Sequence, residues 1–184
     1  MAKQTFEIID GVYRGPRVWK EDLSLVPYKN TLTSLGSLQE VKGDLELDDC
    51  SKLGSLGKLV TVKGCMFLCG CTSLKALEPL KYVGPELGLS NCTSLTSLGS
   101  LQQVNGWVTI EGCQKLVSLG SLQTVKGRIL VNKQGDSSSL SGVQRRIIYY
   151  SSLPAHEALN ALHTDEVQEV PLYKNILLSK LQGC

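Results

Sequence analysis

The stretch "LTSLGSLQEVKGDLELDDCSK", Leu32 to Lys52, is the first of five copies of one 21-residue unit, which follow one another without insertion to residue 136. A fixed period of this length is the signature of a repeat architecture, in which each unit buries its apolar face against its neighbours. The apolar positions form four columns: Leu32, Leu53, Leu74, Leu95 and Leu116; Leu35, Leu56, Leu77, Leu98 and Leu119; Leu38, Leu59, Leu80, Leu101 and Leu122; Val41, Val62, Val83, Val104 and Val125.

Each unit contains a triplet with the two-residue periodicity of a β-strand. In the first copy this triplet is "LEL", so Leu45 and Leu47 are predicted to point inward and Glu46 outward. The remaining apolar residues recur every three positions, which suits a chain that turns corners around a narrow core. The sequence therefore predicts a repeat solenoid with a parallel β-sheet on one face, little helix within the repeats and an α-helical C-terminal cap.

A glycine precedes the triplet in most units, and we expect that its missing side chain relaxes the backbone at a corner. These corner glycines are Gly43, Gly64, Gly106 and Gly127.

The ends of the chain resemble altered repeats, and we expect all parts to form one domain. Residues 1–31 are predicted to be an N-terminal cap with an entry rung, because "KEDLSL" at Lys20 to Leu25 repeats as "KGDLEL" 22 residues later. Residues 32–136 are the five repeats, residues 137–152 a loop with a shortened last rung, and residues 153–184 a helical cap. Pro154 and Pro171 suit first helical turns. Apolar residues expected over the open end of the stack are Leu159, Leu162, Ile176, Leu177 and Leu181.

The segment "VKGDLELDDCSKL", Val41 to Leu53, resembles the L-x-x-L-x-L-x-x-[N/C]-x-x-L core of the leucine-rich repeat superfamily. The "V-x-G-x-L-x-L" step is also similar to the units of receptor L-domains. The resemblance extends from about Lys20 to Tyr150 and implies a fold that hosts many binding roles. In that family the ninth position is a buried Asn or Cys at a turn, which implies a structural ladder of cysteines. Its members here are Cys50, Cys71, Cys92 and Cys113.

The second copy of the repeat, residues 53–73, has two further cysteines, Cys65 and Cys69, which are expected to face outward. One strand holds them too far apart for a single zinc ion, and the carboxylate of Asp48 beside Cys69 should raise the pKa of its thiol. The two histidines, His156 and His163, are likewise too far apart on a helix to chelate one metal. We expect no metal, no cofactor and no enzymatic activity, with a cysteine-dependent enzyme as an alternative.

Composition sets the class of protein but not its partner. The chain has 184 residues, 42% of them hydrophobic and 5% aromatic, so its core must be aliphatic. The formal charge of +2 argues neither for nor against nucleic acid. No apolar run approaches the ~18 residues of a membrane span. An odd count of seven cysteines without an export signal favours reduced thiols and a cytoplasmic location.

The outward positions of the strands are predicted to form one continuous surface that is acidic at its start, aromatic in its middle and basic at its end. Aromatic residues and arginine anchor protein interfaces, whereas polar groups form the rim. We therefore expect a protein–protein interaction module, acting as an adaptor, inhibitor or effector-like binder. The predicted contact residues are Asp44, Glu46, Phe67, Glu86, Trp107, Thr109, Glu111, Arg128 and Arg146.

Two alternatives for this surface remain open. The C-terminal helices or a second copy of the chain would cover part of it, above all Leu130, Ile148 and Tyr150. Nucleic acid would instead follow a basic edge that Gly84 and Asn105 interrupt. That edge consists of Lys20, Lys42, Lys63, Lys126, Arg145 and Arg146.

Overall fold

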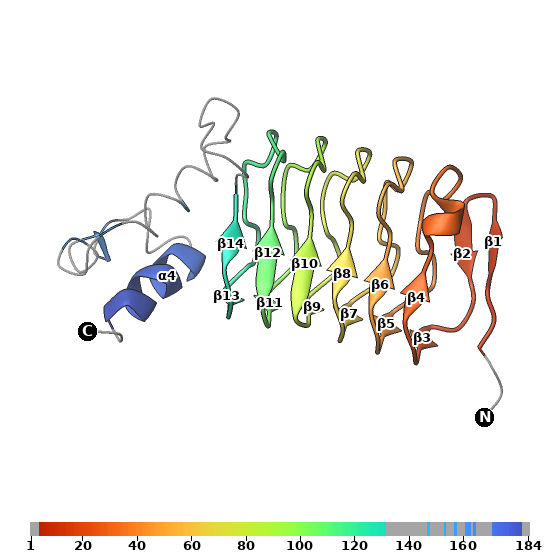
Figure 1. Ribbon diagram of the computed structural model, residues 1–184, viewed down its shortest axis with the longest axis horizontal. Helices are drawn as coiled ribbons and strands as arrows, with labels where there is room; N and C mark the ends of the chain where they lie inside the picture. The colour runs from red at the N-terminus through yellow and green to blue at the C-terminus, as the bar shows by residue number, and fades with distance from the viewer. Residues whose placement is uncertain are drawn as a thin grey trace.

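The protein is an elongated stack of coils with a helix at its C-terminal end (Figure 1). The computed structural model describes residues 4–131, the helix at 171–181, and the single positions Ile147, Leu153, Glu157, Ala161, Leu162 and Thr164. Within these residues, two parallel sheets of six strands each run along the stack.

The first sheet consists of the alternating triplets that the sequence analysis predicted as strands. Successive strands pair in parallel, with Leu23 beside Leu45 and Leu45 beside Met66, so the register advances by 22 residues at the entry rung and by 21 afterwards. The predicted solenoid with little helix in its repeats is therefore confirmed. The strands are β4 (Leu23–Ser24), β6 (Leu45–Glu46), β8 (Met66–Phe67), β10 (Glu86–Gly88), β12 (Trp107–Thr109) and β14 (Ile129–Leu130).

The second sheet was not predicted, because each of its strands has a single inward residue, such as Val41 or Val62, and so shows no alternation in the sequence. It is built around the valine column, and Val41 pairs with Val62 and Val62 with Val83. Isolated β-bridges also join the coils at the serine column, as between Ser34 and Ser55. The strands of this sheet are β3 (Val18–Trp19), β5 (Glu40–Val41), β7 (Thr61–Val62), β9 (Tyr82–Val83), β11 (Gln103–Val104) and β13 (Thr124–Val125).

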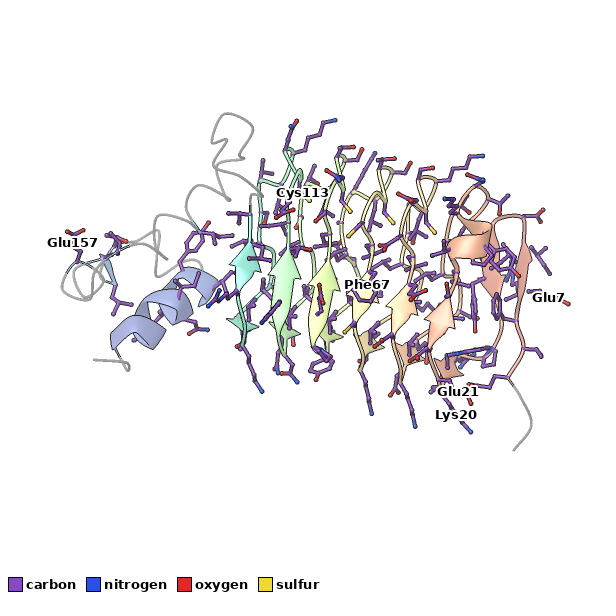
Figure 2. The ribbon with its side chains drawn as sticks, viewed as in Figure 1. Glu7, Lys20, Glu21, Phe67, Cys113 and Glu157 are labelled. Atoms are coloured by element: carbon purple, nitrogen blue, oxygen red, sulfur yellow. The ribbon has the colours of Figure 1, made fainter. Side chains whose placement is uncertain are left out.

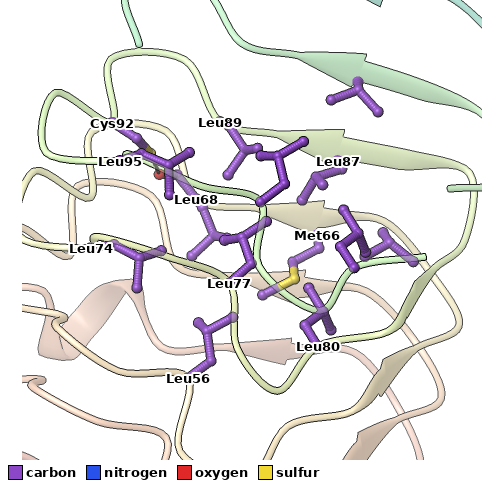
Figure 3. Close-up of a cluster of buried hydrophobic side chains, with 14 of the residues drawn as sticks. Leu56, Met66, Leu68, Leu74, Leu77, Leu80, Leu87, Leu89, Cys92 and Leu95 are labelled. Atoms are coloured by element: carbon purple, nitrogen blue, oxygen red, sulfur yellow. Dashed lines mark hydrogen bonds between the residues drawn. The ribbon is translucent and has the colours of Figure 1, made fainter. Parts of the chain in front are cut away.

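The interior is aliphatic, as the low aromatic content predicts. Leu45 and Leu47 are both 0% exposed, and Glu46 between them is exposed. Figure 3 shows how leucines of successive rungs, such as Leu68 and Leu89, lie in one cluster. Equivalent side chains thus stack above one another, and each rung covers the apolar face of the next.

The corner glycines are required for a reason that differs from the expected one. Gly43, Gly64, Gly106 and Gly127 lie outside the left-handed region. A Cβ at Gly64 would lie 2.5 Å from the carbonyl oxygen of Gly43. Glycine is therefore needed because backbones of neighbouring rungs approach closely, not because the corner needs a relaxed dihedral angle.

The serine column forms turns. In four rungs the serine hydroxyl accepts a hydrogen bond from the amide of the glycine two residues later, as in Ser97 and Gly99 at 2.9 Å. The exception, Ala76, precedes Glu78, which forms a cis peptide bond with Pro79. The hydroxyls therefore stabilise a repeated corner.

The N-terminal end is closed by an antiparallel hairpin of β1 (Glu7–Ile9) and β2 (Val12–Arg14), followed further along by the 3₁₀ turn η1 (Val26–Tyr28). The ring of Phe6 contacts the rings of Tyr13, Trp19 and Tyr28, at centroid distances of 5.5, 5.6 and 5.8 Å. This aromatic cluster covers the first rung, and the hairpin itself was not predicted.

At the C-terminal end, helix α4 (Pro171–Leu181) begins at the proline predicted for a first turn. Leu172 and Tyr173 are buried, and Ile176 packs against the core. Leu162 is also buried, as expected. No helix of the described part is long and apolar enough to cross a membrane.

Several predicted positions lie outside the described residues or have side chains that are not described. They are Pro154, Leu159, Leu177 and Leu181, both histidines, Arg145, Arg146, Ile148 and Tyr150, and most of the predicted loop and last rung at 137–152.

Candidate interaction surface

The outward side of the first sheet, here called the sheet face, carries the predicted contact residues. Strand register places Glu86 beside Trp107, Gly88 beside Thr109 and Glu46 beside Phe67. The structure therefore brings eight of the nine predicted residues onto one face, and the ninth, Arg146, lies outside the described residues. Those on the sheet face are Asp44, Glu46, Phe67, Glu86, Trp107, Thr109, Glu111 and Arg128.

The two aromatic residues of the sheet face have different surroundings. Trp107 is 55% exposed, and its indole edge lies over Gly127 of the next rung. Phe67, labelled near the middle of the sheet in Figure 2, is half-buried. A Cβ placed on Gly88 would lie 3.4 Å from Cδ1 of Phe67, so the phenyl ring covers that glycine. Trp107 is therefore the more accessible anchor, and Phe67 also shields the sheet.

Carboxylates at the acidic end of the face join adjacent rungs. Oδ1 of Asp22 accepts a hydrogen bond from the backbone amide of Asp44 at 2.8 Å, and Oδ1 of Asp44 accepts one from the amide of Cys65 at 2.7 Å. Asp48 does the same for the amide of Cys69 at 2.8 Å. These carboxylates extend the ladder beyond the strands, a structural role that was not predicted. Glu46 is more exposed and keeps its carboxylate at the surface.

The outward cysteines are poorly suited to nucleophilic chemistry. Burial, followed by the charges of Asp44 and Glu86, raises the pKa of the Cys65 thiol. Burial, followed by the charge of Asp48, raises the pKa of the Cys69 thiol, as predicted. A reactive cysteine needs the opposite shift, because the thiolate is the nucleophile. Among the described residues, no cluster of cysteine, histidine and carboxylate side chains could hold a metal ion.

Replacing Asp48 by asparagine is expected to speed alkylation of Cys69 by iodoacetamide at pH 8. The amide oxygen can still accept the bond from the Cys69 backbone, but the negative charge that raises the thiol pKa is gone. Mass spectrometry of the alkylated peptides measures the rate. Cys65, whose acidic neighbours are unchanged, is the internal control. A Cys69 in the unaltered protein that reacts faster than free cysteine would contradict this account.

The buried cysteine column forms a hydrogen-bonded ladder. Sγ of Cys71 donates to the carbonyl oxygen of Leu47 at 3.2 Å, and Sγ of Cys92 donates to that of Leu68 at 3.1 Å. Cys113 repeats the contact one rung later, at 3.0 Å. All four ladder cysteines are free thiols with 0% exposure, and burial raises the pKa of Cys50 to about 11. These positions join the turns of neighbouring rungs.

The basic edge is interrupted in the structure as in the sequence. The side chains of Lys20, Lys42, Lys63 and Lys126 are exposed along one corner. Nζ of Lys63 lies 3.3 Å from a carboxylate oxygen of Glu40. In the gap, Asn105 donates to the hydroxyl of Tyr82 and accepts from Gln103.

Comparisons with protein-family models, with curated proteins and with solved structures gave no match. The fold itself gives the class of protein. It is a parallel β-solenoid whose 21-residue coils stack around an aliphatic core and display one broad sheet face.

Proposed function

We propose that this chain is a solenoid of the leucine-rich repeat type that binds another protein through its sheet face, without enzymatic activity. The observation that carries the proposal is the 55% exposure of Trp107 on a strand in the C-terminal half of that face. Tryptophan and arginine dominate the binding energy of protein interfaces, because they bring large contact areas together with polar groups.

The surroundings of Trp107 suit an interface. Arg128 takes the same outward position one rung after Trp107. Leu130, which lies beside Thr109 on the neighbouring strand, is 39% exposed. Glu86, Thr109 and Glu111 surround these residues with polar groups. An apolar and arginine-containing centre with a polar rim is the usual anatomy of a protein interface. The opposite end of the face, with Asp22 and Glu46, would favour a partner that is basic there.

A capture experiment tests the proposal. The full chain is immobilised, incubated with lysate of its native cell, and compared with Trp107→Ala and Arg128→Ala variants. A protein retained by the unaltered chain should be lost from both. Val117→Ala is the matched control, since Val117 is 71% exposed but lies outside the strands of the sheet. Equal retention by all four proteins would end the proposal.

The leucine-rich repeat assignment makes its own prediction at the cysteine ladder. Since that family accepts Asn or Cys at the turn, Cys92→Asn should keep a donor for the carbonyl oxygen of Leu68. Cys92→Leu removes the donor, and a buried carbonyl without a partner costs about 1–3 kcal/mol. Urea unfolding should therefore show a smaller loss of stability for the asparagine variant. An asparagine variant as unstable as the leucine variant would argue for a different kind of solenoid.

For nucleic acid, the alternative partner, we expect no measurable binding of a single-stranded oligonucleotide even at low ionic strength. The basic edge is interrupted, and its central Lys63 is paired with Glu40. Fluorescence anisotropy over a salt series provides the measurement. Binding that weakens steeply with salt would instead show that the lysines track phosphates.

A further inference from the structure

A cavity of about 790 Å³ lies at the C-terminal end of the stack, between the last described rung and helix α4. Its lining comes from residues 124–130, which include β13 and β14, and from α4, and Figure 1 shows this helix next to these two strands. Its apolar lining comes from both sides: Val125, Ile129 and Leu130 from the rung, and Leu172 and Ile176 from the helix. The volume falls within the range of roughly 300–1,000 Å³ that is usual for small-molecule sites.

Two inward residues of the last described rung are only partly covered at this end. Val125 and Ile129 occupy inward columns, yet both remain partly exposed. In the preceding rung, the equivalent Val104 and Val108 are 0% and 1% exposed. Apolar surface that the other rungs bury is therefore available to a ligand, and its burial is favourable by about 25 cal/mol per Å².

Two cations border this apolar cavity. Lys126 and Arg128 both line it, and both are exposed. Among the described residues, salt bridges join Lys29 to Asp49 and Lys63 to Glu40. Lys126 and Arg128 therefore form no salt bridge within the described part of the chain. An anionic group next to them would form charge-assisted hydrogen bonds, with guanidinium geometry suited to a carboxylate or a phosphate.

We propose that this cavity binds a single-chain amphiphile, with its hydrocarbon tail between the last rung and α4 and its anionic head beside Lys126 and Arg128. The cavity shares Arg128 and Leu130 with the end of the sheet face, but its occupation by an amphiphile does not depend on the proposal of a protein partner. The head group is defined by its chemistry, a carboxylate or a phosphate on an acyl or alkyl chain.

Calorimetric titration of the full chain tests this with three probes below their micelle concentrations. Dodecanoate has both tail and anionic head, dodecyltrimethylammonium has a comparable tail with a cationic head, and acetate has the head alone. Dodecanoate should bind and the other two should not. Absence of dodecanoate binding would overturn the proposal, and equally tight binding of the cationic probe would show that Lys126 and Arg128 play no part. Dodecyl phosphate, titrated in parallel, compares the two head groups.

Substitutions test whether the amphiphile binds in this cavity. Ile176→Trp fills the cavity and should abolish dodecanoate binding, whereas Arg128→Gln should weaken it about tenfold by removing a charged hydrogen-bond donor. Lys52→Gln is the matched control, because it removes an exposed positive charge away from the cavity. If Ile176→Trp perturbs the fold, Arg128→Gln still decides, since that side chain is exposed. Unchanged dodecanoate affinity in Arg128→Gln would refute the site as described.

Discussion

Gly106→Ala is expected to lower the free energy of unfolding by about 3 kcal/mol or more. A Cβ at this corner would overlap the carbonyl oxygen of Pro85 and lie 2.7 Å from its carbonyl carbon. Overpacking of this kind costs about 1–3 kcal/mol where side chains can move aside, and more where the obstacle is backbone. Here the obstacle is the neighbouring rung, so relief requires the coils to separate and their ladder bonds to lengthen.

A second glycine provides the control. Gly54 lies outside the left-handed region, and a Cβ there would meet nothing within 4 Å. Gly54→Ala should therefore be neutral or stabilise the protein by up to about 1 kcal/mol, through lower entropy of the unfolded chain. Urea unfolding of both variants gives the comparison. Equal stabilities for Gly106→Ala and Gly54→Ala would show that the rungs are not as closely spaced at the corner as the structure has them.

The repeated coil could be predicted from the sequence because its cause is periodic. Leu45, Leu47 and their equivalents recur at 21-residue intervals and can share a core only if the units stack in register. The second sheet could not be predicted in the same way. Each of its two-residue strands has one inward residue, usually a valine such as Val62, and a single residue has no periodicity. The pairing there follows from the stacking that the other columns impose.

The N-terminal hairpin was missed for a different reason. Its stability comes from contacts between segments that are distant in sequence, such as Phe6 with Trp19 and Tyr28. The strand "EII" at Glu7–Ile9 is too short to stand out from a loop. Residues 1–31 were therefore recognisable as an altered end of the repeat but not as a particular structure.

The sheet face shows which features of a binding site can be predicted from the sequence. Alternation predicts which residues face outward, and Trp107 and Glu46 are indeed exposed. It does not predict what an outward side chain does to its neighbour. Asp44 was predicted to contact a partner, and alternation did not show that its carboxylate also accepts a hydrogen bond from the next rung. The accessibility of Phe67 likewise depends on Gly88 beside it, because the ring fills the space left by the missing side chain.

The exposure of Trp107 leads to the second large expected effect, a loss of affinity for the partner. Once the partner is captured, Trp107→Ala should weaken its affinity by at least about 30-fold, which corresponds to the ~2 kcal/mol of an interface hot spot. The thermal stability of the variant should stay close to that of the unaltered protein. Most of the indole is in solvent, and the backbone of β12 keeps its hydrogen bonds to β10 and β14.

Phe67→Ala should behave differently, because the phenyl ring is half-buried. Removing the half-buried ring uncovers Gly88 and should cost about 1–2 kcal/mol of stability in addition to any loss of affinity. Titration calorimetry and thermal melting of Trp107→Ala, Phe67→Ala and the Val117→Ala control separate the two effects. If Trp107→Ala binds the partner as tightly as Val117→Ala, the contact lies elsewhere, because no other large hydrophobic side chain on the described sheet face is as exposed as Trp107.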